Sequence, residues 1–398
     1  PVPVAGHRRR LCRGARGSRA QAQGAGDERE IFRAERILVD DFVTTVLRIK
    51  SGIAGAPASA PQTLIFSVSL GDLHRPFHGR MSPWARAMDW LSAEFGVLFV
   101  VSAGNAAHTF DASALPNAAA FAALQGVDRS KAVLGALRDD MRHRTLLAPG
   151  ESINALTVGA LHDDDRNAAA NVGSSFDPLP DGRFPSVVSR LGPGFGRSVK
   201  PDILMRGGRL RVVVGDGAAC AELRPSLANR YGGVRVCGAG VDAGGQAVLE
   251  GWSGASSAAA ALAARGAHRV HDALEFAYGA AFMALPDERK ALVLKALLTH
   301  RARWPQPELA HIIEVFGPGD PRRATAQKMN AMRVFGFGIA DIDEVIGCIE
   351  SRATLWGEGA VVENDASVFR VPLPASLSGQ RVPHAVTATI AWFSTVIP

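Results

Sequence analysis

The sequence has little cysteine and lacks a long apolar run. Four cysteines are spread over 398 residues without a C-x-x-C pair, namely Cys12, Cys220, Cys237 and Cys348. This pattern excludes a disulfide scaffold and a cysteine-rich metal site. No apolar run reaches the roughly 18 residues of a membrane span, so we expect no membrane partner. With 47% hydrophobic and 21% charged residues, the composition is that of a soluble globular protein with a large core.

Positive charge is concentrated in residues 1–36. This segment holds nine Arg, no Lys and four acidic residues, so most of the net charge of +6 lies there. No aromatic residue interleaves with Arg8–Arg19, and we therefore expect no nucleic-acid partner. The segment has almost no apolar periodicity, which predicts disorder or sequence foreign to the fold. The chain begins at Pro1 and stops directly after a predicted strand, so we expect a fragment. The compartment is left open, with the cytoplasm slightly favoured.

The apolar patterns predict an α/β domain over residues 37–350. A helix is expected over 37–48, a buried strand over 63–69, a second helix capped by Ser82 and ended by Gly96, and a buried strand over 97–101. Together the last three form a β-α-β unit, with a right-handed crossover. Residues 153–160 return to the sheet. We therefore expect a doubly wound parallel sheet in three layers, with helices on both faces.

The remaining elements are predicted from similar patterns. Residues 106–150 read as a helical insertion with its best helix over 128–144, and residues 210–214 and 234–237 as the two strands of a short hairpin. A long helix is expected over 258–274, and helices are also expected over 279–300 and 324–350. From Arg352 the pattern alternates, most clearly over 385–392. Residues 351–398 are therefore expected to begin a β-rich second domain.

The centre of the chain is the stretch Gly251–Ala258, which leads into an Ala-rich helix. Ser256 lies where that helix begins, between small residues. Unpaired backbone N–H groups and the helix dipole stabilise negative charge at such a point. A serine in this position is ordinarily just an N-cap, so a chemical role requires a second group.

Asn105 supplies that second group. It follows the strand predicted over 97–101, and Ser256 also follows a predicted strand. Reactive groups gather at the carboxyl ends of parallel strands, so both side chains are expected at one edge. Ser256 would then act as the nucleophile of acyl transfer, and the side-chain amide of Asn105 would donate to the oxyanion.

Several segments, in this order, resemble the subtilisin-like serine peptidases. They are Ser69-Leu70-Gly71, Val100-Val101-Ser102-Ala103-Gly104-Asn105, Leu156-Thr157-Val158-Gly159-Ala160, Lys200-Pro201-Asp202-Ile203, Ser253-Gly254-Ala255-Ser256-Ser257-Ala258 and, less closely, Gly336–Asp341. The resemblance implies a doubly wound sheet, endopeptidase activity and a polypeptide substrate. It also implies that Ser69, Leu70 and Gly71 on one side and Ser102, Ala103 and Gly104 on the other flank the substrate, which pairs with them as an added strand.

Three departures from the family pattern stand out. Ala255 replaces the threonine that precedes the nucleophile, and an alanine replaces the proline that usually follows that segment. The family's Asp and His segments should come before Ser69, yet no Asp-Ser/Thr-Gly or His-Gly-Thr occurs there. His78 comes too late in the order, and Asp40 and Asp41 lie on a predicted helix. The general base and its orienting carboxylate are therefore missing from the pattern.

Three alternatives stay open. Shifting the frame makes Ser253 the nucleophile instead of Ser256. The stretch Gly251–Ala255 also mimics the nucleophile elbow of an esterase-like α/β-hydrolase, with Asp341 or Asp343 and His384 as partners. The third alternative is a non-catalytic scaffold that binds polypeptide, or an inactive remnant.

The sequence predicts no cofactor and no metal ligand set. No carboxylates lie at the spacing of a calcium loop, so structural calcium is not assigned. Small residues at Ser102–Gly104 suggest an open pocket wall, and nothing finer about substrate preference can be read from them.

Overall fold

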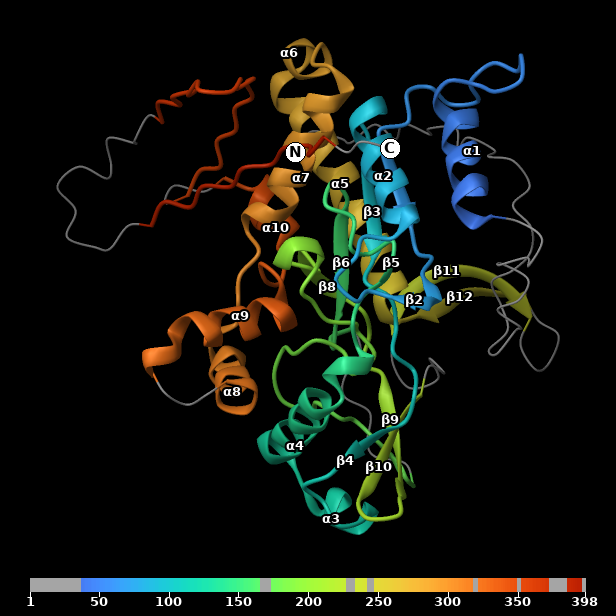
Figure 1. Cartoon of the computed structure of the whole chain (residues 1–398), viewed down its shortest axis with the longest axis vertical. Coiled ribbons are helices and arrows are strands. Elements are labelled where there is room, and N and C mark those ends of the chain that lie inside the picture. Colours follow the sequence, from blue (N-terminus) through green and yellow to red (C-terminus); the bar gives the residue numbers. More distant parts are fainter. Residues whose placement is uncertain are drawn as a thin grey trace, which may run out of the picture.

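The computed structural model describes residues 37–164, 173–226, 233–241, 247–317, 321–348, 352–371 and 385–395. Its centre is a four-stranded sheet in the order β1-β3-β6-β8 (Figure 1), and each neighbouring pair is parallel. The strands are β1 (Ile65–Val68), β3 (Leu98–Ser102), β6 (Leu156–Leu161) and β8 (Ile203–Arg206). The predicted α/β fold with a parallel sheet is confirmed.

Helices cover both faces of this sheet. In β3, Leu98 and Val100 pack on one side against the long helix α5 (Ala255–Tyr278), together with α7 (Asp287–His300) and α10 (Ile342–Ile346). Phe99 and Val101 point to the other side, against α1 (Leu38–Lys50) and α2 (Pro83–Phe95). Because successive side chains of a strand alternate between faces, an all-apolar strand needs a helix on each side. The three predicted layers follow directly.

Helix α2 shows how local sequence fixes these layers. The Oγ of Ser82 accepts a hydrogen bond from the backbone N–H of Ala85, and Pro83 occupies the first helical position. Gly96 ends the helix in the left-handed conformation, with φ of 59°. A side chain at Gly96 would place its Cβ 2.3 Å from the backbone nitrogen of Glu288 in α7. Both predicted ends of this helix are confirmed.

A second lobe lies beyond the carboxyl end of the sheet (Figure 1). It combines an antiparallel sheet in the order β4-β10-β9-β7 with two helices. Its elements are α3 (Ala118–Ala123), α4 (Gly126–Asp139), the 3-10 turn η2 (Met141–His143), β4 (Phe110–Ala112), β7 (Ser175–Phe176), β9 (Arg211–Asp216) and β10 (Ala221–Ser226). The core of this lobe is aromatic and aliphatic, with Phe121, Phe184 and Leu223 among its buried residues.

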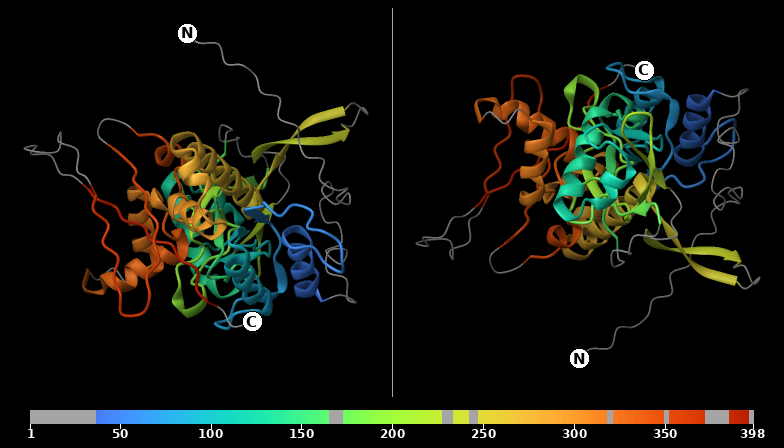
Figure 2. Two further views of the ribbon diagram at one scale, coloured as in Figure 1. Left: turned by 90° about the horizontal axis from the view of Figure 1, so that it is seen from above. Right: turned by 90° about the horizontal axis from the view of Figure 1, so that it is seen from below.

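Two short antiparallel sheets complete the strand pairing. One joins β2 (Asp72–Pro76) to β5 (Leu147–Ala148), and the other joins β11 (Val234–Val241) to β12 (Ala247–Ser253). The second pair forms a ribbon that projects from the body and leads directly into α5 (Figures 1 and 2). The hairpin predicted from residues 210–214 and 234–237 is wrong: β9 pairs with β10 and β7, and β11 pairs with β12. Each segment finds a partner nearer in the sequence.

The C-terminal helices are shorter than the sequence suggests. The helix expected over 279–300 is divided into α6 (Ala280–Met283) and α7, and the one expected over 324–350 into α9 (Ala324–Phe335) and α10. Helix α8 (Gln306–Phe316) and the 3-10 turns η3 (Phe195–Arg197) and η4 (Pro321–Arg323) complete the set. The second break lies at Gly336, whose φ of 63° is in the left-handed region that favours glycine. A Cβ at this position would lie 2.1 Å from the carbonyl oxygen of Pro201. None of the described helices is long and apolar enough to cross a bilayer.

The segment after α10 contains no strand in its described residues, 352–371 and 385–395. The strand predicted over 385–392 is absent, although this stretch contacts the sheet domain. Ser394 and Asn154 exchange two hydrogen bonds of 2.7 and 2.9 Å, and Phe393 packs against the core beside α5. The expected boundaries at 36 and 350 and the β-rich second domain stay predictions, and residues 1–36 lie outside the described residues.

Candidate functional site

The N-terminus of α5 lies at the carboxyl end of the parallel sheet. The backbone N–H of Ala255 donates to the carbonyl of Gly207, 2.7 Å away, and Gly207 directly follows β8. A Cβ at Gly207 would lie 2.5 Å from the Cβ of Ala160 and 3.1 Å from the carbonyl oxygen of Ala255. Only a glycine at this point lets the helix approach the sheet so closely.

Ser256 and Asn105 meet at this edge. The Oδ1 of Asn105 lies 2.7 Å from the Oγ of Ser256 and 3.1 Å from its backbone nitrogen, and accepts a hydrogen bond from each. The two residues are 151 positions apart in the sequence, and Ser256 is fully buried. The structure therefore brings the two predicted residues together, while their catalytic roles stay a prediction.

Asn105 also completes the start of the helix. The N-cap residue of α5 is Gly254, which has no side chain to accept a hydrogen bond, so Asn105 satisfies one of the unpaired N–H groups from another part of the chain. The next residue, Ala255, has a φ of 62°. Left-handed backbone is uncommon for alanine, and this turn presents the N–H of Ser256 to Asn105.

The oxygen of the Asn105 amide, and not its nitrogen, faces Ser256. This oxygen accepts from the N–H of Ser256, which is the donor that a substrate oxyanion would need. An oxyanion-stabilising role requires the amide to turn, so that Nδ2 donates and the backbone N–H of Ser256 becomes free.

The segment Ser69–Gly71 borders the site with an available backbone edge. The Oγ of Ser69 donates to the carbonyl of Ser257 in α5, 3.4 Å away. Ser69 and Leu70 are exposed. Within the part of the chain that the structure describes, the backbone of Ser69–Gly71 makes no hydrogen bond to other backbone groups. An extended peptide could therefore pair here.

The second predicted segment, Ser102–Gly104, is buried. The carbonyl of Ala103 accepts from the N–H of Leu147 at 3.3 Å, and that of Gly104 accepts from the N–H of Arg190 at 3.3 Å. Since the chain itself uses these acceptors, this segment is a wall of the site and offers little free edge.

Leu147 fills the space between the two segments. A Cβ at Gly71 would lie 3.1 Å from the Cβ of Leu147, and a Cβ at Gly104 would lie 2.9 Å from its Cδ1. Leu147 is 2% exposed. Where the small residues Ser102–Gly104 suggested an open wall, the structure places an aliphatic side chain. Sequence reasoning missed Leu147 because nothing in its local pattern marks it.

No imidazole contacts Ser256 among the described residues, where its Oγ hydrogen-bonds Asn105 alone. The residues considered for the missing base and carboxylate lie elsewhere. Asp40 and Asp41 lie in the first turn of α1, and His78 is in an exposed loop after β2. His384 lies outside the described residues.

A buried His–Asp pair does occur at the same end of the sheet. His162 follows β6, and its Nε2 lies 2.8 Å from the Oδ1 of Asp177. Burial alone would raise the pKa of Asp177, but the hydrogen bond and charge of His162, with the N–H of Leu179 and the charge of Arg209, lower it to about 2. The Nδ1 of His162 is buried and has no hydrogen-bond partner among the described residues. The side chains of His162 and Asp177 are 0% and 7% exposed, and no hydrogen bond links either of them to Ser256 among the described residues.

The two Ser253 alternatives stay predictions, because His384 lies outside the described residues. Ser253 ends β12 and is paired with Val234 inside the ribbon. The Oδ1 of Asp341 caps α10 by accepting from Glu344, and Asp343 pairs with Arg269. In the structure these two carboxylates thus have partners in α10 and α5, while Ser256 lies at the helix N-terminus beside the amide of Asn105.

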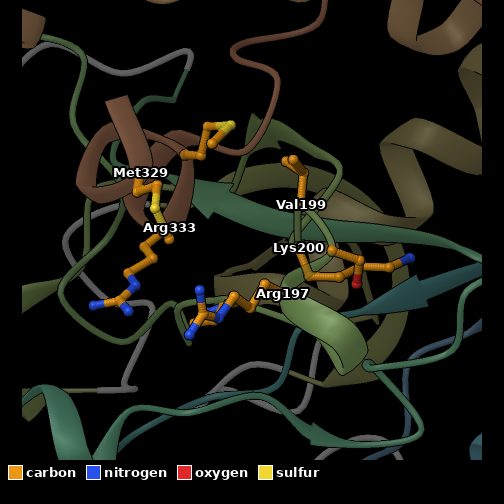
Figure 3. A pocket seen from close by; sticks show the side chains of 8 residues that line it. Arg197, Val199, Lys200, Met329 and Arg333 are labelled. Atoms are coloured by element: carbon orange, nitrogen blue, oxygen red, sulfur yellow. The ribbon is translucent and has the colours of Figure 1, made fainter. Parts of the chain in front are cut away.

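A small pocket elsewhere plays no part in this site. It is lined by Arg197, Val199, Lys200, Met329 and Arg333 (Figure 3). Lys200 precedes β8, so the pocket lies at the amino end of that strand, opposite Gly207. The Nζ of Lys200 instead serves the fold, bonding the Oδ2 of Asp202 at 2.7 Å.

This fold and site define an α/β protein with a serine at a helix N-terminus and an asparagine beside it, at the carboxyl edge of a parallel sheet. Residues 49–338 match the subtilase family (Peptidase_S8), and the chain belongs to this family. Its members are generally serine proteases that act on peptides.

Individual relatives are distant. The chain is 28% identical over 330 residues to "Uncharacterized protein y4bN" of Sinorhizobium fredii (strain NBRC 101917 / NGR234), covering 82% of this chain and 66% of that one. It thus spans just under two thirds of that relative's length. Among solved structures it is similar to the prenylagaramide maturation protease PagA, with 17% identity, a TM-score of 0.35 and coverage of 78% and 67%. For the patellamide maturation protease PatA the values are 16%, 0.33, 76% and 80%.

Proposed function

We propose that the site is that of a subtilisin-type serine endopeptidase, with Ser256 as nucleophile and Asn105 as oxyanion donor. One observation carries the proposal: the amide of Asn105 lies within hydrogen-bonding distance of both the Oγ and the N–H of Ser256. A hydroxyl, a backbone donor and a side-chain amide then surround one point at a helix N-terminus.

The reaction would begin with the turning of Asn105. A substrate carbonyl oxygen then replaces the Oδ1 of Asn105 and accepts hydrogen bonds from the N–H of Ser256 and the Nδ2 of Asn105. The Oγ of Ser256 bonds to the carbonyl carbon, the C–N bond breaks, and the Oγ proton passes to the leaving amine. Water then releases the acyl group from Ser256.

The proton transfer requires a general base, and none of the described residues supplies one. Without a complete triad, the oxyanion site and binding still accelerate hydrolysis by about 10³- to 10⁴-fold over water in a subtilisin. We therefore expect only residual peptide hydrolysis from this chain, dependent on Ser256.

The substrate we propose is an extended polypeptide with a small side chain at the position next to Leu147. Its backbone would pair with Ser69–Gly71, while Ser102–Gly104 forms the opposite wall. Leu147 already occupies the space between Gly71 and Gly104, so we expect glycine or alanine to be accepted there and aromatic side chains to be excluded.

A fluorophosphonate probe tests the nucleophile. Slow covalent labelling of the chain should disappear in Ser256→Ala and persist in Ser253→Ala, the matched control three residues earlier. Mass spectrometry of the labelled peptide identifies the modified serine. Labelling that survives in Ser256→Ala at the wild-type rate would refute the assignment.

The alternative is a scaffold that binds polypeptide without cleaving it. It is favoured by the hydrogen bond that holds the Oγ of Ser256 to Asn105, with no imidazole beside it among the described residues. Fluorescence anisotropy with an alanine-rich peptide separates the two functions. The scaffold would be favoured if the peptide binds saturably and a bulky residue in place of Ser69 blocks this binding. Fluorophosphonate labelling of the wild-type chain should then not exceed that of Ser256→Ala.

A further inference from the structure

Three side chains with metal-ligating atoms converge a few residues from Asn105. The Nε2 of His108 lies 2.7 Å from the Oδ2 of Asp140, and the Nδ1 of His143 lies 2.8 Å from the Oδ1 of the same carboxylate. The three ligand atoms all lie within 4.8 Å of one another. The centres of the two imidazole rings are 5.9 Å apart, and the rings are nearly perpendicular. Each ring directs one nitrogen toward the same carboxylate.

The carboxylate is fixed from behind by Arg144. The Nε of Arg144 lies 2.7 Å from the Oδ2 of Asp140, and its guanidinium stacks 4.3 Å from the centre of the Phe110 ring. The Nη1 of Arg144 donates to the carbonyl of Val187, and the side chain is fully buried. A partner that orients a ligating carboxylate is a regular feature of protein metal sites.

The opposite side of the cluster is open to solvent. The side chain of Asp140 is only 12% exposed, whereas those of His108 and His143 are 37% and 74% exposed. Asp140 caps the end of α4 and His143 ends η2, three residues later, so two of the three groups share one rigid turn. An ion held here would keep a free position for water.

We propose that His108, Asp140 and His143 bind a divalent first-row transition metal ion such as Zn²⁺. Two imidazole nitrogens and one carboxylate oxygen match the ligand preference of this class, whereas Ca²⁺ and Mg²⁺ prefer oxygen alone. Metal–ligand bonds of about 2.0 to 2.2 Å place neighbouring donor atoms roughly 3.3 Å apart, so small side-chain rotations would bring the three donors to an ion. Each imidazole must present a lone pair, which requires its proton on the other ring nitrogen. The sequence, which predicts no metal ligand set, does not reveal this site.

The site would clamp the segment that carries Asn105. His108 lies three residues after Asn105, while Asp140 and His143 belong to α4 and η2. Arg190 already links the two parts: its Nε donates to the carbonyl of Asn105 at 3.1 Å, and its Nη1 to the carbonyl of His143 at 3.2 Å. A metal ion would add a second link beside it.

A second group of candidate ligands provides a matched control. His271, Asp272 and Glu275 also lie within 4.8 Å of one another, but all three come from one helix. Each of their His–carboxylate distances is 3.9 Å, and the two carboxylates are 73% and 45% exposed. Nothing comparable to Arg144 is seen behind them among the described residues, so we expect weaker binding there.

Metal titration of the whole chain tests the proposal. We expect calorimetry with Zn²⁺ to give one tight equivalent, and Co²⁺ to give the intense visible absorption of a four-coordinate ion. His108→Ala and His143→Ala should each weaken Zn²⁺ binding by about 10-fold or more, the scale of effects around metal sites, while His271→Ala should leave it unchanged. Ca²⁺ should not compete.

Circular dichroism without metal shows whether each variant folds. If the alanine variants do not fold, the wild-type protein decides: Zn²⁺ must shift the imidazole NMR signals of His108 and His143 before those of His271. No saturable Zn²⁺ binding, equal affinity in all three variants, or a first response at His271 would overturn the proposal.

Discussion

Replacing Leu147 with alanine is expected to open the space between Gly71 and Gly104. The leucine is 2% exposed, and truncating such a side chain usually costs 2 to 5 kcal/mol of stability. Its neighbours on both sides are glycines, which have no side chains that could move into the gap. We therefore expect a loss in the upper part of this range, about 3 to 5 kcal/mol, measured by urea unfolding.

The same cavity should change peptide preference. Burying a phenylalanine or leucine side chain is worth about 1.5 to 3 kcal/mol. Each 1.4 kcal/mol corresponds to a tenfold change in affinity, so a peptide with such a residue at the position next to Leu147 should gain about 10- to 100-fold in Leu147→Ala. Alanine-containing peptides should gain little.

Fluorescence anisotropy with two peptides that differ only at that position, Ala against Phe, measures the change without requiring catalysis. Leu91→Ala is the matched control, because Leu91 is also buried but lies in α2, in the core cluster that α2 forms with α1. It should destabilise the protein to a similar extent without altering preference. Equal Ala-to-Phe ratios in wild type and Leu147→Ala would refute this role of Leu147.

Three further predictions concern Asn105, Asp177 and Gly207. Asn105→Ala should slow fluorophosphonate labelling about 100- to 1,000-fold, the effect of one such donor in a subtilisin. Losing a helix cap alone costs about 1 kcal/mol of stability. A variant that shows this loss of stability without the slower labelling would contradict the oxyanion role. Asp177→Asn should cost about 2 to 3 kcal/mol above pH 5, because the folded pKa of about 2 lies below the unfolded value near 3.9. This contribution is present above the unfolded pKa and is lost as pH falls through the folded one, so wild-type and variant unfolding curves should converge near pH 2; a constant gap would contradict the ionic origin. Gly207→Ala should reduce stability and labelling together, since its Cβ would overlap that of Ala160; unchanged labelling would show that the Gly207–Ala255 contact does not position Ser256.

The sequence predicts the sheet and its covering helices well because both follow local periodicity. It also predicts that Ser256 and Asn105 lie at one edge, but part of the reasoning is wrong. The strand before Ser256, β12, belongs to the projecting ribbon and not to the parallel sheet. What brings Ser256 to the edge is the packing of α5 on the sheet and the bond from Ala255 to Gly207.

Features that depend on distant contacts could not be predicted. Leu147 reaches Gly71 and Gly104 through the pairing of β5 with β2, and no local pattern signals that meeting. His108 and His143 are 35 positions apart and come together only through the placement of η2. The hairpin error has a similar origin, since apolar alternation identifies strands but not their partners.

The Asn105 oxygen is a tethered competitor for every ligand that approaches Ser256. To bind at Ser256, a substrate carbonyl oxygen must displace the side-chain oxygen of Asn105, which already accepts hydrogen bonds from Ser256. The apparent dissociation constant is the intrinsic one divided by the fraction of molecules in which the amide has turned away. All ligands that use the same two donors are therefore weakened by one common factor. An interaction that holds the Asn105 amide turned away from Ser256 would raise the affinity of all these ligands by the same factor, without contacting the ligands themselves.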